Sequence, residues 1–456
     1  MQYRLLFLIA GDLFFGVAAL FGGFLLRFGY DQSIGEAARK PFANLALFLS
    51  VLVVSSYIFE IYNLAKHGSR REIFSHIASA ACVSFVVLSI IYFMMPPLII
   101  GRGLLGLSLS LFVCYQYFWH MVFMMVHDKS FLAENILILG TGASALAIGD
   151  FVQSPKNNFG YTLSGYVSGG NGGGAAVSGR QIIGRVDDLA EIVRRERVSQ
   201  VVMSEQVRQD QAELQHVLLN CKLHGVKIVD APSFLEPMTG KLMLEYLDMN
   251  WLIYADGFLR PPVYVAIKRL MDIVLSVIGI ILSLPLFPVI ALLIKLDSPG
   301  PIFFTQTRVG QWGKNFVLYK FRTMNDDAER ETGAVWAQKN DLRVRPIGRF
   351  LRKYRFDEIP QLFNVLKGDM SFVGPRPERP EFVEELDRQI PFYAKRHFIK
   401  PGITGWAQIK YAYGASVKDA YEKMQYDLYY FKHMSLLEDL MIIMKTFRVV
   451  IFGKGR

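Results

Sequence analysis

The chain has 456 residues, and at about 150 residues per domain this length predicts roughly three structural units. Hydrophobic residues make up 52% of the chain and charged residues 20%, a balance that fits neither an ordinary soluble enzyme nor a transporter made only of membrane helices. The net charge of +10 comes from cations that alternate with long apolar runs, so we expect an anionic lipid surface and a phosphorylated substrate as partners, and no nucleic acid.

Four apolar segments open the chain, at residues 5–26, 42–62, 73–95 and 104–126. Each is long enough for the roughly 20 residues that a membrane-spanning helix needs, so residues 1–128 are predicted to form a four-span transmembrane domain. Asp12, Glu60 and His120 interrupt these segments as isolated polar residues, and a position facing the helix bundle or the membrane interface is the simplest interpretation of each. Cations on successive loops balance, so charge alone leaves the orientation open.

The three cysteines, Cys82, Cys114 and Cys221, form no CxxC pair. Neither a zinc site nor a disulfide framework is therefore expected, and a reducing compartment is the simpler interpretation.

A different pattern begins at NILILGTGASALAIGD, where a short apolar strand leads into Gly140, Gly142 and Ala145 with GxGxxA spacing and then a helix. This opening is typical of a dinucleotide-binding fold, so residues 129–260 are predicted to hold a Rossmann-like domain that ends in a linker from about residue 234. Ser168 and two glycines follow the second strand, where an acidic residue would hold ribose hydroxyls. We therefore expect a structural or regulatory domain and no bound nicotinamide cofactor.

A long apolar helix is predicted at about residues 266–295, with Pro285 and Pro288 in its middle. Proline removes a backbone hydrogen bond and clashes with the preceding turn, so a sharp break is expected. Cations flank both ends, which suits a helix that turns back to the same face of the bilayer, but a kinked fifth span fits the pattern equally well. The C-terminal segment SLLEDLMIIMKTFRVVIFGKGR is apolar with interspersed cations, and this pattern predicts an amphipathic helix lying in the membrane interface.

Two adjacent carboxylates, Asp357 and Glu358, stand in RKYRFDEIPQLFNVLKG between two helical patterns. One interpretation is purely structural: Asp357 caps the second helix, Pro360 occupies its first turn and Gly368 ends it. The other is catalytic, because a carboxylate at a helix N-terminus stays anionic and the same N–H groups would bind a phosphoryl group attached to it.

Successive helical residues point about 100° apart, so the two carboxylates would take different roles, one attacking phosphorus and the other, Glu358, holding Mg²⁺. Phosphoryl transfer consists mostly of positioning and charge neutralisation, for which arginine forks are suited. The candidate cations for the phosphate oxygens are Arg308, Lys320, Arg322, Arg352 and Arg376, with Lys353 and Arg355 beside Arg352 in the same cationic cluster.

Residues 261–456 closely resemble the bacterial sugar transferases, the monotopic phosphoglycosyl transferases that begin exopolysaccharide and O-antigen assembly. The matching stretches are KRLMDIVLS, SPGPIFFTQTRVGQWGKNFVLYKFRTM, IGRFLRKYRFDEIPQLFNVLKGDMSFVGPRPE and KPGITGWAQIK. With the apolar and Rossmann-like parts ahead of it, the chain resembles the long-form polyisoprenyl-phosphate hexose-1-phosphate transferases, and its C-terminal region resembles a branch associated with exopolysaccharide loci.

The resemblance implies transfer of a sugar-1-phosphate from a UDP-sugar to undecaprenyl phosphate with release of UMP. It implies a covalent phosphosugar on Asp357, Mg²⁺ on Glu358, and Arg352 and Arg376 near the phosphates. It also implies a re-entrant helix broken near Ser283 and Pro285, a catalytic domain on the cytoplasmic face of the bacterial inner membrane, and a homodimer. Overall, we expect a membrane protein of α and α/β class with a mainly α catalytic domain.

Two other functions fit parts of the sequence. A membrane-anchored NAD-dependent sugar-nucleotide dehydratase or epimerase would use the GTGASA turn, but it would also need a YxxxK pair, and the pair Tyr62 and Lys66 precedes the glycines and lies at a helix end. A non-catalytic assembly scaffold would not depend on Asp357. The identity of the sugar cannot be read from motif spacing.

Overall fold

The computed structural model of the chain describes residues 2–29, 42–59, 61–62, 70–127, 134–154, 160–168, 182–204, 212–247, 249–325, 336, 341, 343–411, 414 and 416–451. It contains two compact units, Met1–Ala231 and Pro232–Arg456.

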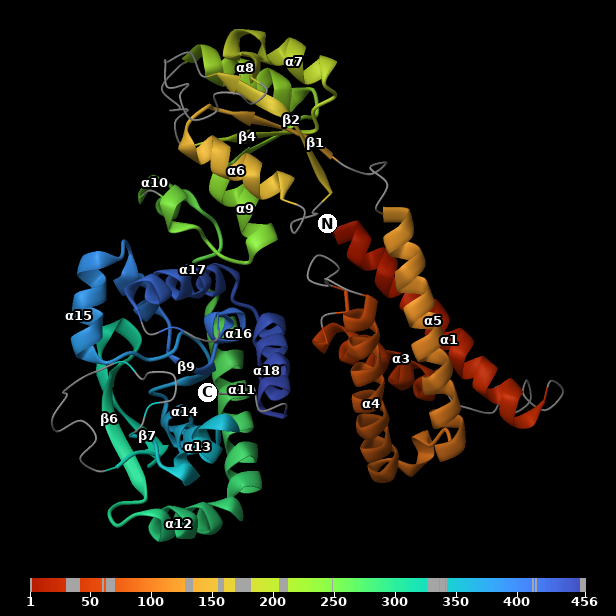
Figure 1. Cartoon of the computed structure of the whole chain (residues 1–456), viewed down its shortest axis with the longest axis vertical. Coiled ribbons are helices and arrows are strands. Elements are labelled where there is room, and N and C mark those ends of the chain that lie inside the picture. The colour runs from red at the N-terminus through yellow and green to blue at the C-terminus, as the bar shows by residue number, and fades with distance from the viewer. Residues whose placement is uncertain are drawn as a thin grey trace. The chain divides into compact units, whose positions relative to one another are not determined.

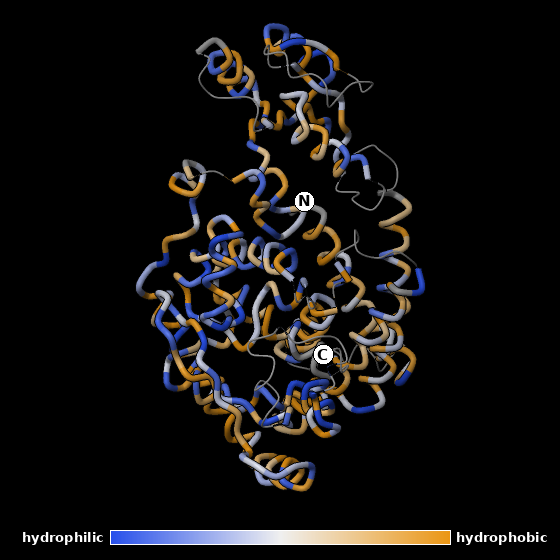
Figure 2. The backbone as a smooth tube through the Cα atoms, turned by 60° about the vertical axis from the view of Figure 1, so that its left-hand side comes forward, coloured by the Kyte–Doolittle hydropathy of each residue, from blue (hydrophilic) through white to orange (hydrophobic). Residues whose placement is uncertain are grey.

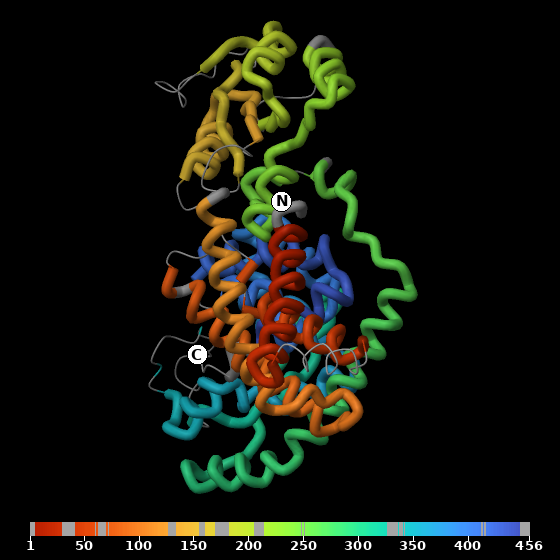
Figure 3. The backbone as a smooth tube through the Cα atoms, turned by 90° about the vertical axis from the view of Figure 1, so that its right-hand side faces the viewer, coloured from red at the N-terminus to blue at the C-terminus, as the bar shows by residue number. Residues whose placement is uncertain are grey.

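Four apolar helices begin the first unit. They are α1 (Gln2–Phe28), α3 (Phe42–Ile58), α4 (Arg70–Met94) and α5 (Arg102–His127). All four contribute to one hydrophobic core, in which Phe24, Leu52, Leu88 and Phe112 are buried. Helices α1 and α5 lie side by side along much of their length (Figures 1 and 3).

Among the described residues, 3 single helices are long and apolar enough to cross a membrane: α1, α4 and α5. Helix α3 has only 17 residues. At 1.5 Å per residue it is about 25 Å long, which is shorter than the ~30 Å hydrocarbon core of a bilayer. Three of the four predicted spans therefore meet the requirement, and the described part of the fourth is short. Figure 2 colours the backbone of the chain by the hydropathy of each residue.

Asp12 and His120 face the interior of this helix group and contact each other, with 3.3 Å between Oδ1 and Nε2. Gln116 donates from Nε2 to Asp12 Oδ2 at 2.5 Å and to Ser56 Oγ at 2.9 Å. The predicted bundle-facing position is confirmed for Asp12 and His120, but the expectation that they are isolated is wrong, because the pairing joins residues 108 positions apart. Glu60 lies outside the described residues.

A parallel five-stranded sheet, in the order β3-β2-β1-β4-β5, forms the rest of the first unit. Its elements are β1 (Glu134–Leu139), α6 (Ala143–Gln153), β2 (Tyr161–Ser168), β3 (Ile182–Arg185), η4 (Val186–Asp188), α7 (Leu189–Arg195), β4 (Gln200–Met203), α8 (Ala212–Leu223) and β5 (Lys227–Asp230). Helix α6 covers one face of the sheet, and α7 and α8 cover the other (Figure 1). The strands predicted from the apolar runs are confirmed.

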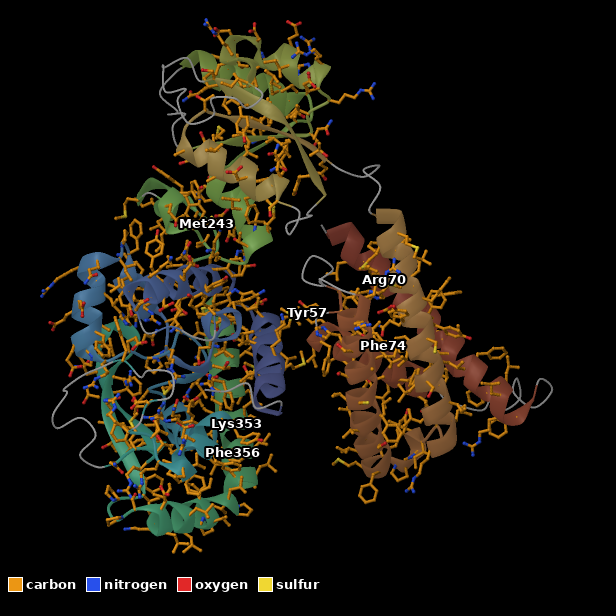
Figure 4. The ribbon with its side chains drawn as sticks, in the orientation of Figure 1. Tyr57, Arg70, Phe74, Met243, Lys353 and Phe356 are labelled. Atoms are coloured by element: carbon orange, nitrogen blue, oxygen red, sulfur yellow. The ribbon has the colours of Figure 1, made fainter. Side chains whose placement is uncertain are left out.

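The region predicted as a linker is largely helical. It comprises α9 (Ala231–Thr239), η5 (Leu244–Tyr246) and α10 (Met249–Tyr254). Leu242 and Leu244 are buried in a core shared with Leu386 and Leu428, so this region packs as part of the second unit. Figure 4 labels Met243 within this region.

The long apolar helix of the second unit is broken at the predicted place. Helix α11 (Pro262–Ser283) ends one residue before Leu284, α12 (Leu286–Asp297) starts after Pro285, and the two axes differ by 61° (Figure 1). Ser283 Oγ donates to Ile280 O at 3.1 Å, so its hydroxyl bonds back into the last turn of α11. The proline-based prediction of the break is confirmed.

The remaining elements of the second unit combine helices with two small sheets. They are β6 (Phe303–Val309), η6 (Gln311–Gly313), β7 (Asn315–Phe321), α13 (Pro346–Lys353), η7 (Phe356–Glu358), α14 (Gln361–Lys367), β8 (Ser371–Val373), α15 (Pro380–Gln389), η8 (Tyr393–Phe398), β9 (Gly402–Thr404), α16 (Trp406–Lys410), α17 (Val417–His433) and α18 (Leu436–Ile451). Strands β6 and β7 are antiparallel, and β8 and β9 are parallel.

Candidate active site

The carboxylate pair lies on a short 3-10 turn between two helices. Arg355 has a left-handed backbone, with φ of 60°, and this conformation ends the run of α13 and starts the turn Phe356–Glu358. Figure 4 labels Lys353 and Phe356 on either side of this change. Helix α14 begins only at Gln361, with Pro360 at its N-cap, and Gly368 ends it with φ of 103°.

The capping prediction for Asp357 is therefore wrong, whereas the stop at Gly368 is confirmed. Asp357 precedes the cap position by three residues, and its Oδ1 has no hydrogen-bond partner among the described residues. Because the left-handed Arg355 is followed by a 3-10 turn, helix α14 starts only at Gln361, and the N-cap falls at Pro360 instead of Asp357.

A cavity of about 410 Å³ opens beside the pair, within the range of small-molecule sites. All the predicted reactive and substrate-binding side chains line it: Arg308, Lys320, Arg322, Arg352, Asp357, Glu358 and Arg376. Ser283 and Pro285 do not line it, because they lie at the helix break. The cavity brings together residues that are distant in the sequence. Lys320 on β7 and Asp357 on η7, for example, are 37 positions apart.

Glu358 is surrounded by three cations. Its Oε1 lies 2.8 Å from Arg376 Nη2 and 3.2 Å from Lys320 Nζ, and its Oε2 lies 3.2 Å from Arg355 Nη1. Burial by itself would raise the pKa of Glu358, but the charges of Arg376, Lys320 and Arg355 outweigh it and hold the pKa well below its ordinary value. Glu358 is therefore a fixed anion.

Asp357 has the opposite environment, although it is equally buried at 6% exposure. Burial and then the neighbouring Glu358 charge raise the pKa of Asp357, against the lowering effect of Lys320 and Arg352. The adjacent carboxylates are therefore driven apart in acidity, a pattern that is found at reactive sites. Asp357 is the carboxylate that would gain most from an added positive charge.

Two of the basic side chains that line the cavity are themselves perturbed. Burial lowers the pKa of Lys320 to about 8, with Glu358 acting against this shift. Burial also lowers the pKa of Arg352, and its Nε donates to Thr323 Oγ1 at 2.9 Å. Thr323 thus sets the direction of the Arg352 guanidinium.

The GPRPE loop that carries Arg376 is held along its length. Asp272 on α11 accepts hydrogen bonds from Phe372 N at 3.0 Å and Ser371 Oγ at 3.1 Å, and Lys268 Nζ, one turn earlier, donates to Val373 O at 3.3 Å. Beyond the strand, Arg396 Nη2 donates to Arg376 O at 3.1 Å, and Arg308 Nη1 donates to Pro377 O at 3.1 Å. These bonds fix the backbone from which Arg376 reaches Glu358.

Arg322 and Arg308 are partly committed to structural contacts. Arg322 donates to Pro299 O at 2.6 Å and to Ser298 O at 2.9 Å, so its guanidinium holds the turn after α12. Arg308 also contacts Gln306 Oε1 at 2.6 Å. Both line the cavity, but Arg376 contacts Glu358 directly and Arg352 interacts electrostatically with Asp357.

Several features that build the site were not predicted. Arg355 is one of the candidate cations before Asp357, but its contact with Glu358 and its left-handed backbone had no signal in the sequence. Arg396 is buried between Asp427, at 2.8 Å, and the Arg376 carbonyl. The residues next to Arg396 in the sequence form no recognisable motif, so nothing local pointed to this role. Asp272 and Lys268 belong to the KRLMDIVLS stretch, and a charged pair one turn apart on an apolar helix was the signal available for them.

The donor set fits a divalent cation that relies on substrate phosphates. Within the described parts of the chain, no three His, Cys, Asp or Glu side chains gather into a metal-binding group. The site instead offers two adjacent carboxylates, one with a buried oxygen that lacks a hydrogen-bond partner among the described residues. Mg²⁺ is typically bound by one or two carboxylates plus phosphate oxygens and water.

The second unit matches the profile of the family described as bacterial sugar transferase over residues 263–453. The chain is 46% identical over 243 residues to the UDP-N-acetylgalactosamine-undecaprenyl-phosphate N-acetylgalactosaminephosphotransferase of Aeromonas hydrophila, covering 53% of this chain and 56% of that protein. It is 42% identical over 192 residues to the UDP-glucose:undecaprenyl-phosphate glucose-1-phosphate transferase of Xanthomonas campestris pv. campestris, covering 42% and 40%.

A third relative is almost fully covered. The exopolysaccharide production protein PSS of Rhizobium leguminosarum bv. phaseoli is 41% identical over 191 residues, which is 40% of this chain and 92% of that protein. The matched part thus spans about half the length of the first two relatives and nearly all of the third. The chain belongs to the bacterial sugar transferase family.

Proposed function

We propose that this protein transfers a sugar-1-phosphate from a UDP-sugar to undecaprenyl phosphate and releases UMP, as the first membrane step of exopolysaccharide or O-antigen synthesis. The names of the Aeromonas and Xanthomonas relatives support this reaction class. The names of these two relatives give different sugars, N-acetylgalactosamine and glucose. We therefore infer that residues lining the cavity of each protein select its sugar.

One observation carries the proposal: Asp357 is a buried carboxylate whose Oδ1 has no hydrogen-bond partner among the described residues. It stands beside a fixed anion and within a ring of cations at a cavity of about 410 Å³. A nucleoside diphosphate sugar brings negative charge that Arg352, Arg376 and Lys320 are suited to neutralise. A nucleophile whose pKa differs strongly from that of its neighbour fits a two-step transfer.

In the first step, a carboxylate oxygen of Asp357 attacks the phosphorus that bears the sugar. The bond from that phosphorus to the bridging oxygen breaks, and UMP leaves with the electron pair. In the second step, a phosphate oxygen of undecaprenyl phosphate attacks the same phosphorus, and Asp357 leaves as a carboxylate. Arg376 keeps Glu358 ionised throughout, and Arg352 faces the phosphate oxygens.

Glu358 and Asp357 are the residues that would hold Mg²⁺. When bound, the cation supplies positive charge to the diphosphate and to the carboxylate pair. Both oxygens of Glu358 contact cations, so the unpartnered oxygen in the pair belongs to Asp357, which extends the expected metal-binding role from Glu358 to both residues.

A re-entrant geometry for α11 and α12 is supported by the contacts at their two outer ends. At the start of α11, Lys268 Nζ lies 2.7 Å from Asp439 Oδ2. At the end of α12, Asp297 Oδ2 lies 3.3 Å from Arg345 Nε. Between Lys268 and Lys295 the exposed residues are apolar, including Leu282 at 73% and Leu292 at 60% exposure. A straight crossing would place these two ends, which join one compact unit, on opposite sides of the bilayer.

The remaining parts of the proposal concern organisation. We place a four-span domain at residues 1–128, a Rossmann-like regulatory or dimerisation domain with its linker at 129–260, the linker packing with the second unit, and the catalytic domain at 261–456. The catalytic domain would act at the cytoplasmic face of the inner membrane, with α18 in the interface, and the protein would act as a homodimer.

Intact-protein mass spectrometry tests the reaction. Purified protein with Mg²⁺ and a UDP-sugar should gain the mass of one sugar phosphate and release UMP before any lipid is added. Addition of undecaprenyl phosphate should then discharge the adduct, and Asp357→Asn should form none. Initial rates that require both substrates together, with no adduct, would contradict the covalent route. A screen of UDP-sugars for UMP release would identify the sugar.

A further inference from the structure

The first turn after β1 in the parallel sheet has the geometry of an anion site. Gly140 has a φ of 124° and donates from its N–H to Val167 O at 2.8 Å, so the chain turns sharply at the end of the strand. Gly142 is the N-cap of the 11-residue helix α6, and no side chain caps it. The first turn of α6 contains no acidic residue, so its N–H groups and positive dipole end have no anionic side chain of their own turn.

A buried hydroxyl lies beside this turn without a partner. Ser204 follows β4, is 3% exposed, and its Oγ has no hydrogen-bond partner in the described part of the chain. Its N–H donates to Leu139 O at 3.0 Å, which sets Ser204 level with Gly140, one position beyond the pair Leu139 and Met203. Leaving a buried hydroxyl unsatisfied costs about 1–3 kcal/mol, so a missing partner is a meaningful observation.

Strand alternation gives the direction in which Ser204 points. Val201 packs in a core with residues of α7 and α8, and Met203 packs against the same core. Side chains alternate between the faces of a strand, so Ser204 points to the opposite face, which α6 covers (Figure 1). The free hydroxyl and the uncapped start of α6 therefore lie on the same face and at the same edge of the sheet.

This edge is also where the chain changes direction across the sheet. Strand β1 is flanked by β2 and β4. The chain passes from β1 to β2 through α6 on one face, and it later crosses from β3 to β4 through α7 on the other face. In open parallel sheets, ligands bind outside the carboxyl ends of the strands at such a switch point. The site is thus defined by three features that are independent of each other: topology, an uncapped helix and an unpartnered buried hydroxyl.

We propose that the sheet of the first unit binds the phosphate group of a nucleotide at the carboxyl ends of β1 and β4, separately from the transferase cavity. The backbone N–H groups at the start of α6 donate to the phosphate oxygens, and Ser204 Oγ donates to the phosphate or its ester oxygen. Ser168 ends β2 in place of the acidic residue that would hold free ribose hydroxyls. The ligand is therefore recognised by its phosphate, and no hydride transfer is involved.

Full-length protein in detergent, with ADP and inorganic phosphate as probes, tests this site by hydrogen–deuterium exchange. ADP should protect the backbone amides of residues 140–146. Ser204→Ala should weaken ADP binding about 2-fold to 12-fold, the value of one hydrogen bond of about 0.5–1.5 kcal/mol, while thermal stability stays equal or rises because an unsatisfied hydroxyl is removed. Inorganic phosphate should protect the same amides at higher concentration.

Two controls separate this site from the transferase cavity. Ser199→Ala removes a hydroxyl at the opposite end of β4, where Oγ donates to Asn135 O at 3.0 Å, and should leave ADP binding unchanged. Arg376→Ala disables the transferase cavity and should also leave the protection of residues 140–146 intact. Absence of protection with millimolar ADP, or binding that Arg376→Ala abolishes and Ser204→Ala does not alter, would overturn the proposal.

Discussion

Arg376 and Glu358, which are 18 positions apart, meet with 2.8 Å between Nη2 and Oε1. This contact links the loop after β8 to the turn that carries both carboxylates. Arg376 is the largest of the influences that lower the pKa of Glu358, and Glu358 in turn is the main influence that raises the pKa of Arg376. Each residue thus fixes the charge of the other before any substrate enters.

Replacement of Arg376 should impair formation of the sugar-phosphate adduct. Arg376→Ala should slow adduct formation by about 100-fold, the typical effect of losing one preorganised charged donor. Arg376→Lys should recover only part of the rate, because an ammonium group lacks the planar fork that can serve Glu358 and a phosphate together. Quenched-flow mass spectrometry measures both. Lys367→Ala is the matched control, since Lys367 pairs with Asp369 at 3.6 Å on the surface, and an equal loss there would contradict a specific role.

The transfer rate should fall as pH rises through about 8. Lys320 has its pKa lowered to about 8, so it loses its positive charge in this range and no longer neutralises Glu358 and the phosphates. Lys320→Arg keeps the charge at all these pH values and should remove the alkaline decline. Initial rates of UMP release between pH 6 and about 10 would show the difference. An alkaline limb that persists in Lys320→Arg assigns the titration to another group.

The two adjacent carboxylates should have opposite effects on stability. The folded protein raises the pKa of Asp357 above its unfolded value, so stability is lost as pH rises from the unfolded pKa through the folded one, and neutral pH lies on the destabilised side. Asp357→Asn should therefore raise Tm, by about 2–4 °C for each 1 kcal/mol relieved, while it abolishes the adduct.

Glu358→Gln supplies the matched comparison, because it removes the same charge one residue later. The folded state lowers the pKa of Glu358, so its ionised form stabilises the protein above the unfolded pKa, and that stability is lost as pH falls through the folded pKa. Glu358→Gln should therefore lower Tm at neutral pH. Differential scanning fluorimetry in detergent compares the two variants, and shifts of the same sign would contradict the charge assignment.

The re-entrant geometry predicts labelling from one face only. In a background with Cys82, Cys114 and Cys221 replaced by serine, single cysteines at Val263 and Leu296 lie at the two outer ends of the broken helix and are exposed, at 68% and 75%. A membrane-impermeant maleimide should label both from the cytoplasmic side of inverted vesicles and neither from the outside of intact cells. Labelling of the two positions from opposite sides would establish a kinked span.

Local sequence patterns predicted the helices and strands well, but they did not predict which of them contact each other. The break near Ser283 and Pro285 was predictable because proline acts on its own turn. The gathering of Arg308, Lys320 and Arg352 beside the carboxylates was a hypothesis from their types and order. The contact between Asp12 and His120 was not predictable, since nothing local reports which faces of two distant helices meet.

The error at Asp357 has a local physical cause. Composition favours a helix on both sides of the DEIP segment, but the left-handed backbone of Arg355 inserts a 3-10 turn before α14. Arginine has no propensity that announces this conformation, which costs about 1–3 kcal/mol in general and is retained by surrounding contacts. One of those contacts is the pair of Arg355 and Glu358 at 3.2 Å. Arg355 thus both adopts the left-handed backbone and contacts the carboxylate Glu358 of the candidate active site.

The hydrogen bonds from α11 to the loop before Arg376 have a consequence for lipid recognition. Asp272 and Lys268 attach β8 to a helix whose further turns expose apolar side chains. In the proposed membrane arrangement, the depth to which that helix sinks sets the height of Arg376 above the hydrocarbon. The depth of the helix in the membrane therefore places the phosphate-binding groups at the level of the lipid headgroups, where the phosphate of a polyisoprenyl phosphate lies.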